Sequence, residues 1–400
     1  MVLKSAIQTA YLFQQEKIKQ NKIVVTRNKN VSVASDNNFI QVISGVRRCG
    51  KSTLLNFLML QYNKVCYLNF EDPRIINFEV ADFYKLEDIL PKNVEAYFFD
   101  EIQNVPQWEL YIRQLHDHGK KVFITASNAS LLSKDLGTRL TGRYLNTELF
   151  PFSYEEFLVF EKKKAGILSL ENYLKKGGFP EFLKLENEEI LQNLFKDIVL
   201  RDIAIRHGIR NTKVLVDIAL FLLSNIGKET TYNSLRKAFQ VGSTNTVIDY
   251  LFWLEDAYLL FFLHKFSWSA KSISVNPRKV YAIDNGLINA NSLSFSQDNG
   301  RILENAVYIH LRNMGTKMYY FKEKNECDFV LFEKEKCTTA LQVCYEINAD
   351  NKTRELDGLL EAMQFFNLEE GLIITQNQKD TIKTKNKTIY LIPAFEYFMV

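Results

Sequence analysis

The chain has 400 residues, of which 46% are hydrophobic and 24% charged, and its formal net charge is +3. This length and composition predict two or three globular domains, and so small a charge identifies no nucleic-acid partner. No apolar run is long enough to cross a bilayer, the first 15 residues lack the features of a signal peptide, and the five cysteines show no Cys-x-x-Cys spacing. We therefore expect a cytoplasmic protein with free thiols and no membrane partner.

The first elements are a helix over 3–20, a polar lead-in over 21–38 and an apolar strand over 39–44. The strand is followed at once by Gly45-Val46-Arg47-Arg48-Cys49-Gly50-Lys51-Ser52 and then by an apolar helical pattern. A Gly-x-x-x-x-Gly-Lys-Ser loop between a strand and a helix is the phosphate-binding P-loop. Nucleotide binding is therefore the first functional prediction.

The glycines allow the loop to turn its amides toward a phosphate, and the helix behind it adds partial positive charge. The expected nucleotide contacts are Gly45, Arg48, Cys49, Gly50, Lys51, Ser52 and Thr53. In this arrangement Lys51 reaches the β- and γ-phosphates, and the Ser52 hydroxyl binds Mg²⁺.

Strands are expected over 65–70 and 96–101, and the second of these ends in Asp100 and Glu101. Downstream of a P-loop, Asp100 would hold Mg²⁺, and Glu101 would orient or deprotonate the attacking water. The alternative is that the two acids merely open the next loop.

A further strand over 121–126 ends at Ser127-Asn128. Asn128 would either sense the γ-phosphate or help to begin a helix near residue 129. Arg139 and Arg143 then precede a strand over 144–150. These arginines would either stabilise transition-state charge, in the same chain or on a neighbouring subunit, or form surface ion pairs.

Several motifs carry a family resemblance: Gly45-x-Arg47-Arg48-x-Gly50-Lys51-Ser52, Asp100-Glu101-Ile102-Gln103-Asn104-Val105-x-x-Trp108, Thr125-x-Ser127-Asn128, Gly142-Arg143, Pro151-Phe152-Ser153-Tyr154-Glu155-Glu156-Phe157 and Gly177-Gly178-Phe179-Pro180-Glu181. Together they resemble bacterial and archaeal AAA-type ATPases that carry a C-terminal domain of unknown function, DUF4143. The resemblance covers nearly the whole chain. It implies an AAA+-like parallel sheet and ATP as the nucleotide, and it favours Arg143 over Arg139. It implies no substrate.

The middle of the chain reads as helices over 152–160, 170–185 and 189–206, with Gly177-Gly178 as either a hinge or a tight turn. The elements that follow, three helices and two strands over 213–283, have the order of a winged helix. Its expected recognition helix, 243–254, contains no Lys or Arg, so DNA contact and protein contact both stay open.

The C-terminal part places Glu304 on a helix, Asp328 on a strand and Gln342-Val343-Cys344 on a paired strand. This order resembles the PD-(D/E)xK nuclease core, with Gln342 at the second acid and Cys344 at the lysine. We expect no nuclease activity, and Glu304 and Asp328 form either a buried structural pair or a remaining metal site. The lysines over 379–387 indicate a solvated loop, with contact to nucleic acid as the lesser alternative.

The sequence thus predicts an α/β chain with a P-loop ATPase core over 1–150, a helical lid-like segment over 151–208, a winged helix over 209–284 and a restriction-endonuclease-like domain over 285–400. The predicted function is Mg²⁺-dependent ATP hydrolysis coupled to movement of the later domains, which would contact DNA or a protein. A homo-oligomer fits this prediction. The alternative is a nucleotide-gated DNA-binding module with little turnover.

Overall fold

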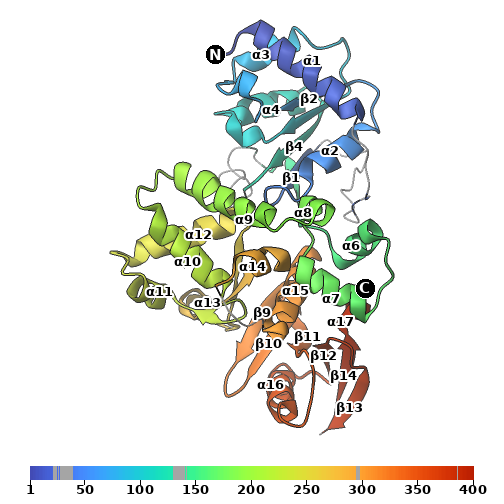
Figure 1. Ribbon diagram of the computed structural model, residues 1–400, viewed down its shortest axis with the longest axis vertical. Helices are drawn as coiled ribbons and strands as arrows, with labels where there is room; N and C mark the ends of the chain where they lie inside the picture. Colours follow the sequence, from blue (N-terminus) through green and yellow to red (C-terminus); the bar gives the residue numbers. More distant parts are fainter. Residues whose placement is uncertain are drawn as a thin grey trace. The chain divides into compact units, whose positions relative to one another are not determined.

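The computed structural model describes residues 1–20, 25, 27, 39–128, 140, 142–293, 298–384 and 386–400. The chain divides into two compact units, residues 1–150 and 151–400, and each is described by itself. Figure 1 traces both units in sequence colours. Three sequence predictions lie wholly or mostly outside the described residues: the lead-in over 21–38, the helix from residue 129 and Arg139.

The first unit contains a five-stranded parallel sheet with the order β2-β3-β4-β1-β5. Its strands are β1 (Ile40–Ser44), β2 (Val65–Asn69), β3 (Ala96–Asp100), β4 (Lys121–Ala126) and β5 (Tyr144–Glu148). Every residue of β1 and β3 is buried, as expected for parallel strands that are covered on both faces. The predicted α/β fold with an AAA+-like parallel sheet is confirmed.

The helices of the first unit are α1 (Lys4–Gln20), α2 (Lys51–Met59), η1 (Pro73–Ile75), α3 (Asp82–Glu87), η2 (Ile102–Asn104) and α4 (Trp108–Asp117). Helix α1 packs against β2 and α3 (Figure 1). Aromatic rings fill much of this core, and the rings of Phe83 and Tyr111 stack with their centroids 4.0 Å apart. Such packing fixes the sheet, and therefore the loops at its ends, in one arrangement.

The second unit begins with the helices α6 (Tyr154–Glu161), α7 (Ile167–Lys176), α8 (Pro180–Leu185) and α9 (Glu189–Lys196), the π-helical segment η4 (Asp197–Ile205), α10 (Thr212–Leu223), α11 (Tyr232–Ala238), α12 (Thr244–Asp256), α13 (Ala270–Val275) and α14 (Asn285–Asn291). Three strands, β6 (Glu229–Thr230), β7 (Leu260–His264) and β8 (Arg278–Ala282), form a sheet with the order β6-β8-β7. The helix expected over 170–185 is in fact two helices, because the chain leaves helical geometry at Gly177.

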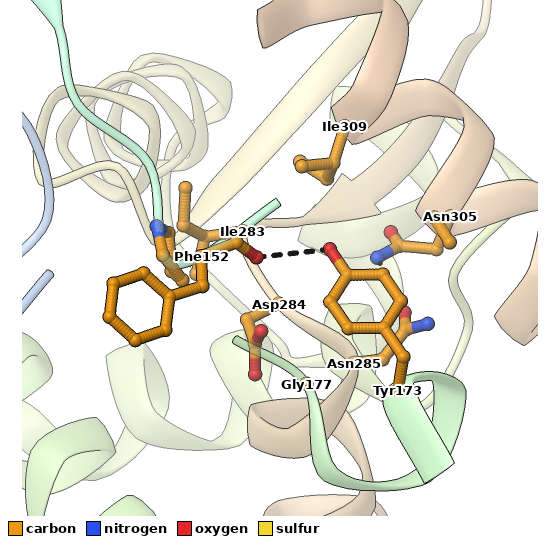
Figure 2. A pocket seen from close by; sticks show the side chains of 10 residues that line it. Phe152, Tyr173, Gly177, Ile283, Asp284, Asn285, Asn305 and Ile309 are labelled. Carbon is orange, nitrogen blue, oxygen red and sulfur yellow. Dashed lines mark hydrogen bonds between the residues drawn. The ribbon is translucent and has the colours of Figure 1, made fainter. Parts of the chain in front are cut away.

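Several hydrogen bonds hold the turn between α7 and α8, and Figure 2 shows Tyr173, Gly177 and Asp284 around the pocket that they line. The amide of Gly178 donates to a carboxylate oxygen of Asp284 at 2.6 Å, and the Tyr173 hydroxyl donates to the carbonyl oxygen of Phe152 at 3.1 Å. A Cβ atom at Gly177 would lie 2.1 Å from a carboxylate oxygen of Asp284. Of the two alternatives, the geometry favours a packed turn over a hinge.

The remaining helices are α15 (Asn299–Asn313), α16 (Lys352–Phe365) and α17 (Ala394–Tyr397). They accompany a six-stranded mixed sheet with the order β13-β14-β12-β11-β10-β9. Its strands are β9 (Lys317–Lys322), β10 (Glu326–Glu333), β11 (Lys336–Val343), β12 (Glu370–Thr375), β13 (Asp380–Thr384) and β14 (Lys387–Pro393).

The prediction of a loop over 379–387 is wrong for most of these residues. Lys383 lies in β13 and Lys387 begins β14, and these strands form an antiparallel hairpin at the edge of the sheet. The ammonium of Lys387 donates to the carbonyl oxygen of Leu368 at 2.5 Å. Lysines are common on edge strands because their charge opposes pairing with another sheet, so a charge run did not exclude a strand here.

Among the described helices, none is both long and apolar enough to cross a membrane.

Candidate nucleotide-binding site

The P-loop leaves β1 at Gly45 and enters α2 after Gly50, and both positions require glycine. A Cβ atom at Gly45 would lie 2.1 Å from the carbonyl oxygen of Leu149. Gly50, with φ of 106°, is the N-cap of α2, in a region that side chains with a Cβ atom rarely adopt. The loop backbone therefore passes close to β5 and turns sharply into the helix, as phosphate binding requires.

Lys51 is the buried cation of this loop. Its ammonium donates to the carbonyl oxygens of Gly45 at 3.0 Å and Val46 at 3.2 Å, and it lies 3.4 Å from a carboxylate oxygen of Glu101. Burial alone would lower the pKa of Lys51, but the negative charge of Glu101 raises it above its ordinary value. The lysine therefore stays charged, which suits it to bind a phosphate.

Asp100, the last residue of β3, is fully buried. One carboxylate oxygen accepts hydrogen bonds from the Tyr67 hydroxyl at 3.0 Å and the Asn69 amide at 3.1 Å, and the other accepts from the Thr125 hydroxyl at 2.5 Å. Burial and the neighbouring Glu101 raise the pKa of Asp100, whereas a hydrogen bond from the Ser52 hydroxyl lowers it. The hydroxyl and the carboxylate predicted to hold Mg²⁺ are thus adjacent.

Glu101 follows β3 with φ of 54°, and its backbone amide donates to the Thr125 hydroxyl at 2.9 Å. Its carboxylate accepts a hydrogen bond from the Gln103 amide at 2.5 Å, and that amide also donates to the Ser127 hydroxyl at 3.1 Å. Burial would raise the pKa of Glu101, but the positive charge of Lys51 holds it below its ordinary value. An ionised carboxylate in this position can accept a proton.

The oxygen donors at this place match the preference of Mg²⁺ for carboxylate and hydroxyl ligands next to phosphate. Ser52 comes from the P-loop and Asp100 from the end of β3, and the Ser52 hydroxyl is near enough to Asp100 to act on the pKa of its carboxyl. The residues present therefore fit a Mg²⁺-nucleotide.

The other predicted contacts have less defined positions. Asn128 is buried just beyond β4, and its role as a γ-phosphate sensor or as a helix cap stays a prediction. Cys49 is buried, and burial raises the pKa of its thiol. Its carbonyl oxygen accepts a hydrogen bond from Arg27 at 3.0 Å. Arg48 is exposed on the loop with φ of 64°.

Arg143 does not join the site within its own chain. It directly precedes β5, and its carbonyl oxygen accepts a hydrogen bond from the amide of Ile40 at 2.9 Å, at the start of β1. The P-loop begins at the other end of β1, roughly 16 Å away at about 3.3 Å per residue. The guanidinium forms an ion pair with Asp117 at 2.8 Å. This position favours a contribution to a neighbouring subunit over one in the same chain, and the role of Arg143 stays a prediction.

Several residues of the site were not assigned a role from the sequence. Tyr67, Asn69, Gln103 and Thr125 hold the two acids, and Arg47 forms an ion pair with Glu71 at 3.0 Å. Asn69 and Thr125 lie at the C-terminal ends of parallel strands, where polar side chains gather around ligands, whereas Tyr67 lies in the middle of β2. A polar residue at the end of a predicted strand was therefore the sequence feature that could have identified Asn69 and Thr125.

The predicted nuclease-like residues lie in the second unit. The side-chain oxygen of Gln342 accepts from the amide of Asp328 at 3.1 Å, and its side-chain nitrogen donates to Glu355 at 2.8 Å. This amide is therefore committed to structural bonds rather than to a metal. Cys344 is buried just after β11, while Glu304 and Asp328 both contact Lys279.

Comparison with protein families finds matches along nearly the whole chain. Residues 37–158 match an AAA domain. Residues 167–298 match a domain of unknown function, DUF8612, and residues 299–397 match a second one, DUF4143.

Two curated relatives align over most of their length. An uncharacterized protein of Methanocaldococcus jannaschii is 38% identical over 92% of this chain and 90% of its own. An uncharacterized protein of Haemophilus influenzae is 32% identical over 89% of this chain and 94% of its own. Among solved structures, AMPPCP-bound DnaA from Aquifex aeolicus is 14% identical over 64% of this chain and 89% of its own, with a TM-score of 0.27, which is too low to support an inference.

Proposed function

The chain belongs to the family that joins an AAA domain to a C-terminal DUF4143 domain, and we propose that it hydrolyses ATP with Mg²⁺ at the site just described. One observation carries the proposal: Lys51 and Ser52 of the P-loop lie beside Asp100, the last residue of β3, and Glu101, which follows it. The ammonium of Lys51 lies 3.4 Å from Glu101, and the Ser52 hydroxyl is near enough to Asp100 to oppose the rise in the pKa of its carboxyl.

Binding begins with the amides of the P-loop, which donate to the phosphates of ATP. Lys51 turns from the carbonyl oxygens of Gly45 and Val46 to the phosphate oxygens, which are stronger acceptors because they are charged. Ser52 and Asp100 would hold Mg²⁺, which supplies positive charge beside the transferred phosphoryl group. Asn128 would contact the γ-phosphate.

Glu101 is the candidate base. Its pairing with Lys51 holds the carboxylate ionised, and the lysine is drawn away when it contacts phosphate. The carboxylate is then available to orient the attacking water and to take its proton, while Gln103 keeps hold of one of its oxygens. The Lys51–Glu101 contact thus links phosphate binding to release of the base.

Phosphate release by the Glu101→Gln variant tests the proposal. We expect at least about a 100-fold lower rate than for the wild type, because loss of a positioned base costs a factor of this order. Glu95→Gln is the matched control, since Glu95 is exposed and directly precedes β3, at the opposite end from Glu101. Equal rates for Glu101→Gln and wild type would contradict the assignment of the base. A wild type that binds ATP without releasing phosphate would support a nucleotide-gated module instead.

We further propose that the nucleotide state moves residues 151–400 and that their partner is a protein rather than DNA. The exposed face of α12 presents Asn245, Ile248, Asp249 and Phe252, and the helix has no Lys or Arg. Ile248 is 38% and Phe252 52% exposed. DNA binding depends on cations that meet phosphates, so this face suits an apolar protein surface. DNA would be the favoured partner if the protein bound DNA in a salt-sensitive way, if Phe252→Ser left this binding unchanged, and if Asp249→Lys strengthened it.

A further inference from the structure

Three carboxylates of the second unit converge on one ammonium. Lys279 of β8 places its Nζ atom 3.1 Å from Glu304 of α15, 2.8 Å from Glu326 of β10 and 2.7 Å from Asp328 of the same strand. Lys279 is only 1% exposed. Each of the three N–H groups of the ammonium therefore has one carboxylate within reach.

Neighbouring groups hold the same carboxylates in place. The Tyr281 hydroxyl donates to the Glu304 oxygen that faces the lysine, at 2.6 Å, and the backbone amide of Val343 donates to the second oxygen of Asp328 at 3.0 Å. Glu326 also forms an ion pair with Lys322 at 3.0 Å. The cluster is thus bonded from several elements of the unit, among them β8, α15, β10 and β11.

The charges in this cluster depend on one another. Burial alone would lower the pKa of Lys279, but Asp328 and Glu304 raise it well above its ordinary value. Burial and the charge of Asp328 raise the pKa of Glu304 to about 7. The lysine therefore stays charged, and without it the buried acids would have no cation in their midst.

Convergent carboxylate oxygens are what a divalent cation requires, and here the point of convergence is filled by Nζ of Lys279. The part of the chain that the structure describes contains no group of three or more His, Cys, Asp or Glu side chains arranged to hold a metal ion. Glu304 and Asp328 are each less than a tenth exposed, so a nucleic-acid backbone has no direct approach to them.

We propose that the ammonium of Lys279 is the resident cation of this carboxylate cluster. It occupies the position that a divalent metal ion would need, so the C-terminal domain holds its acids together without metal and does not cleave nucleic acid. The cation comes from β8, the strand that precedes this domain, and it therefore also joins β8 to α15 and β10.

Replacing the lysine tests this directly in the full-length protein. Lys279→Met keeps much of the side-chain length but removes the charge, so the three carboxylates are left to attract a cation. We expect a lower melting temperature than in the wild type, and a rise of about 5 °C or more when millimolar Mn²⁺ is added. Electron paramagnetic resonance should count about one more bound Mn²⁺ per chain in this variant than in the wild type.

Two controls separate this effect from general ion binding. Lys322 pairs with Glu326 at the edge of the cluster, and its side chain is 39% exposed. The Lys322→Met variant should gain no Mn²⁺ site. Lys279→Met combined with Asp328→Asn removes one acid together with the cation, so it should recover stability without metal and lose the response to Mn²⁺. If Lys279→Met folds only when Mn²⁺ is present during refolding, the same conclusion holds.

Three results would overturn the proposal. The first is that Mn²⁺ raises the melting temperature of Lys279→Met no more than that of the wild type, or that this variant fails to fold with Mn²⁺ while the double variant folds. The second is a Mn²⁺ site in the wild type that Asp328→Asn abolishes. The third is Mg²⁺-dependent cleavage of DNA or RNA by the wild type that Asp328→Asn removes.

Discussion

The ammonium of Lys51 and the carboxylate of Glu101 lie 3.4 Å apart, with side chains 4% and 11% exposed. One residue begins the helix after the P-loop and the other follows β3. In an enclosed place of this kind the pair keeps both groups charged, so the phosphate-binding group and the candidate base are prepared together. Phosphate binding must exchange this contact for a new one.

Thr125 is the first test of how the two acids are held. Its hydroxyl donates to Asp100 and accepts from the amide of Glu101. Thr125→Val has a similar volume but leaves both buried groups without this partner, and we expect a loss of roughly 1–3 kcal/mol in unfolding free energy. Phosphate release should fall as well, because Asp100 and Glu101 lose their fixed positions.

Thr125→Ser is the matched control, because it keeps the hydroxyl. Denaturant unfolding and phosphate release should both lie near wild type for the serine variant. If the valine variant matched the serine variant in both measurements, the hydroxyl would have no role in holding the acids.

The P-loop, the sheet and the two acids after β3 could be predicted because each is a local pattern of neighbouring residues. The partners of Asp100 could not, since Tyr67 is 33 residues away and Thr125 is 25 residues away. The position of Arg143 followed only from strand pairing, which places it at the far end of β1. Sequence spacing gave no indication of which end of the sheet the arginine would reach.

The second unit shows the same limit. Glu304 and Asp328 were recognisable from the order of elements, but Lys279 lies 25 and 49 residues earlier, and no local pattern connected it with them. Its burial is a consequence of tertiary packing. The β13–β14 hairpin was missed because its lysines hid the alternation of buried Ile389 and Leu391 with partly exposed Tyr390.

Arg143 yields a prediction about assembly. Because its guanidinium pairs with Asp117 and is 42% exposed, Arg143→Ala should change unfolding free energy by no more than about 1 kcal/mol. ATP binding by a single chain should be unchanged. If the arginine acts on a neighbouring subunit, phosphate release should fall strongly in the variant.

Mixing of variants is the check. Arg143→Ala subunits have an intact P-loop, and Lys51→Ala subunits have an intact arginine, so mixed assemblies should release more phosphate than either variant alone. Full activity of Arg143→Ala by itself would leave the arginine as a surface ion-pair partner only.

Asp284 predicts a specific pH dependence. Burial raises its pKa from 3.8 to about 6, although the amides of Gly178 and Leu287 oppose the shift. Between these values the folded chain holds a proton that the unfolded chain has lost, so this group's contribution to stability falls as the pH rises from about 4 to about 6, by roughly 3 kcal/mol in total.

Asp284→Asn cannot titrate. The amides of Gly178 and Leu287 donate to different carboxylate oxygens, so the one side-chain oxygen of Asn keeps only one of these two hydrogen bonds, a loss that does not depend on pH. The melting temperature of the variant, relative to wild type, should therefore rise with pH across this window and level off above it. A difference that stayed constant from about pH 4 to about pH 7 would show that the carboxyl is ionised throughout.

The central claim is that a Mg²⁺-ATP is bound and hydrolysed against the P-loop. Its most direct test is phosphate release from ATP by wild type, Lys51→Ala and Lys64→Ala, each with Mg²⁺ and with excess EDTA. Lys64 is the control because it is exposed and directly precedes β2, at the opposite edge of the sheet. We predict Mg²⁺-dependent release by wild type and Lys64→Ala and at least about a 100-fold loss in Lys51→Ala. Equal release by wild type and Lys51→Ala, or no Mg²⁺-dependent release by wild type, would contradict it.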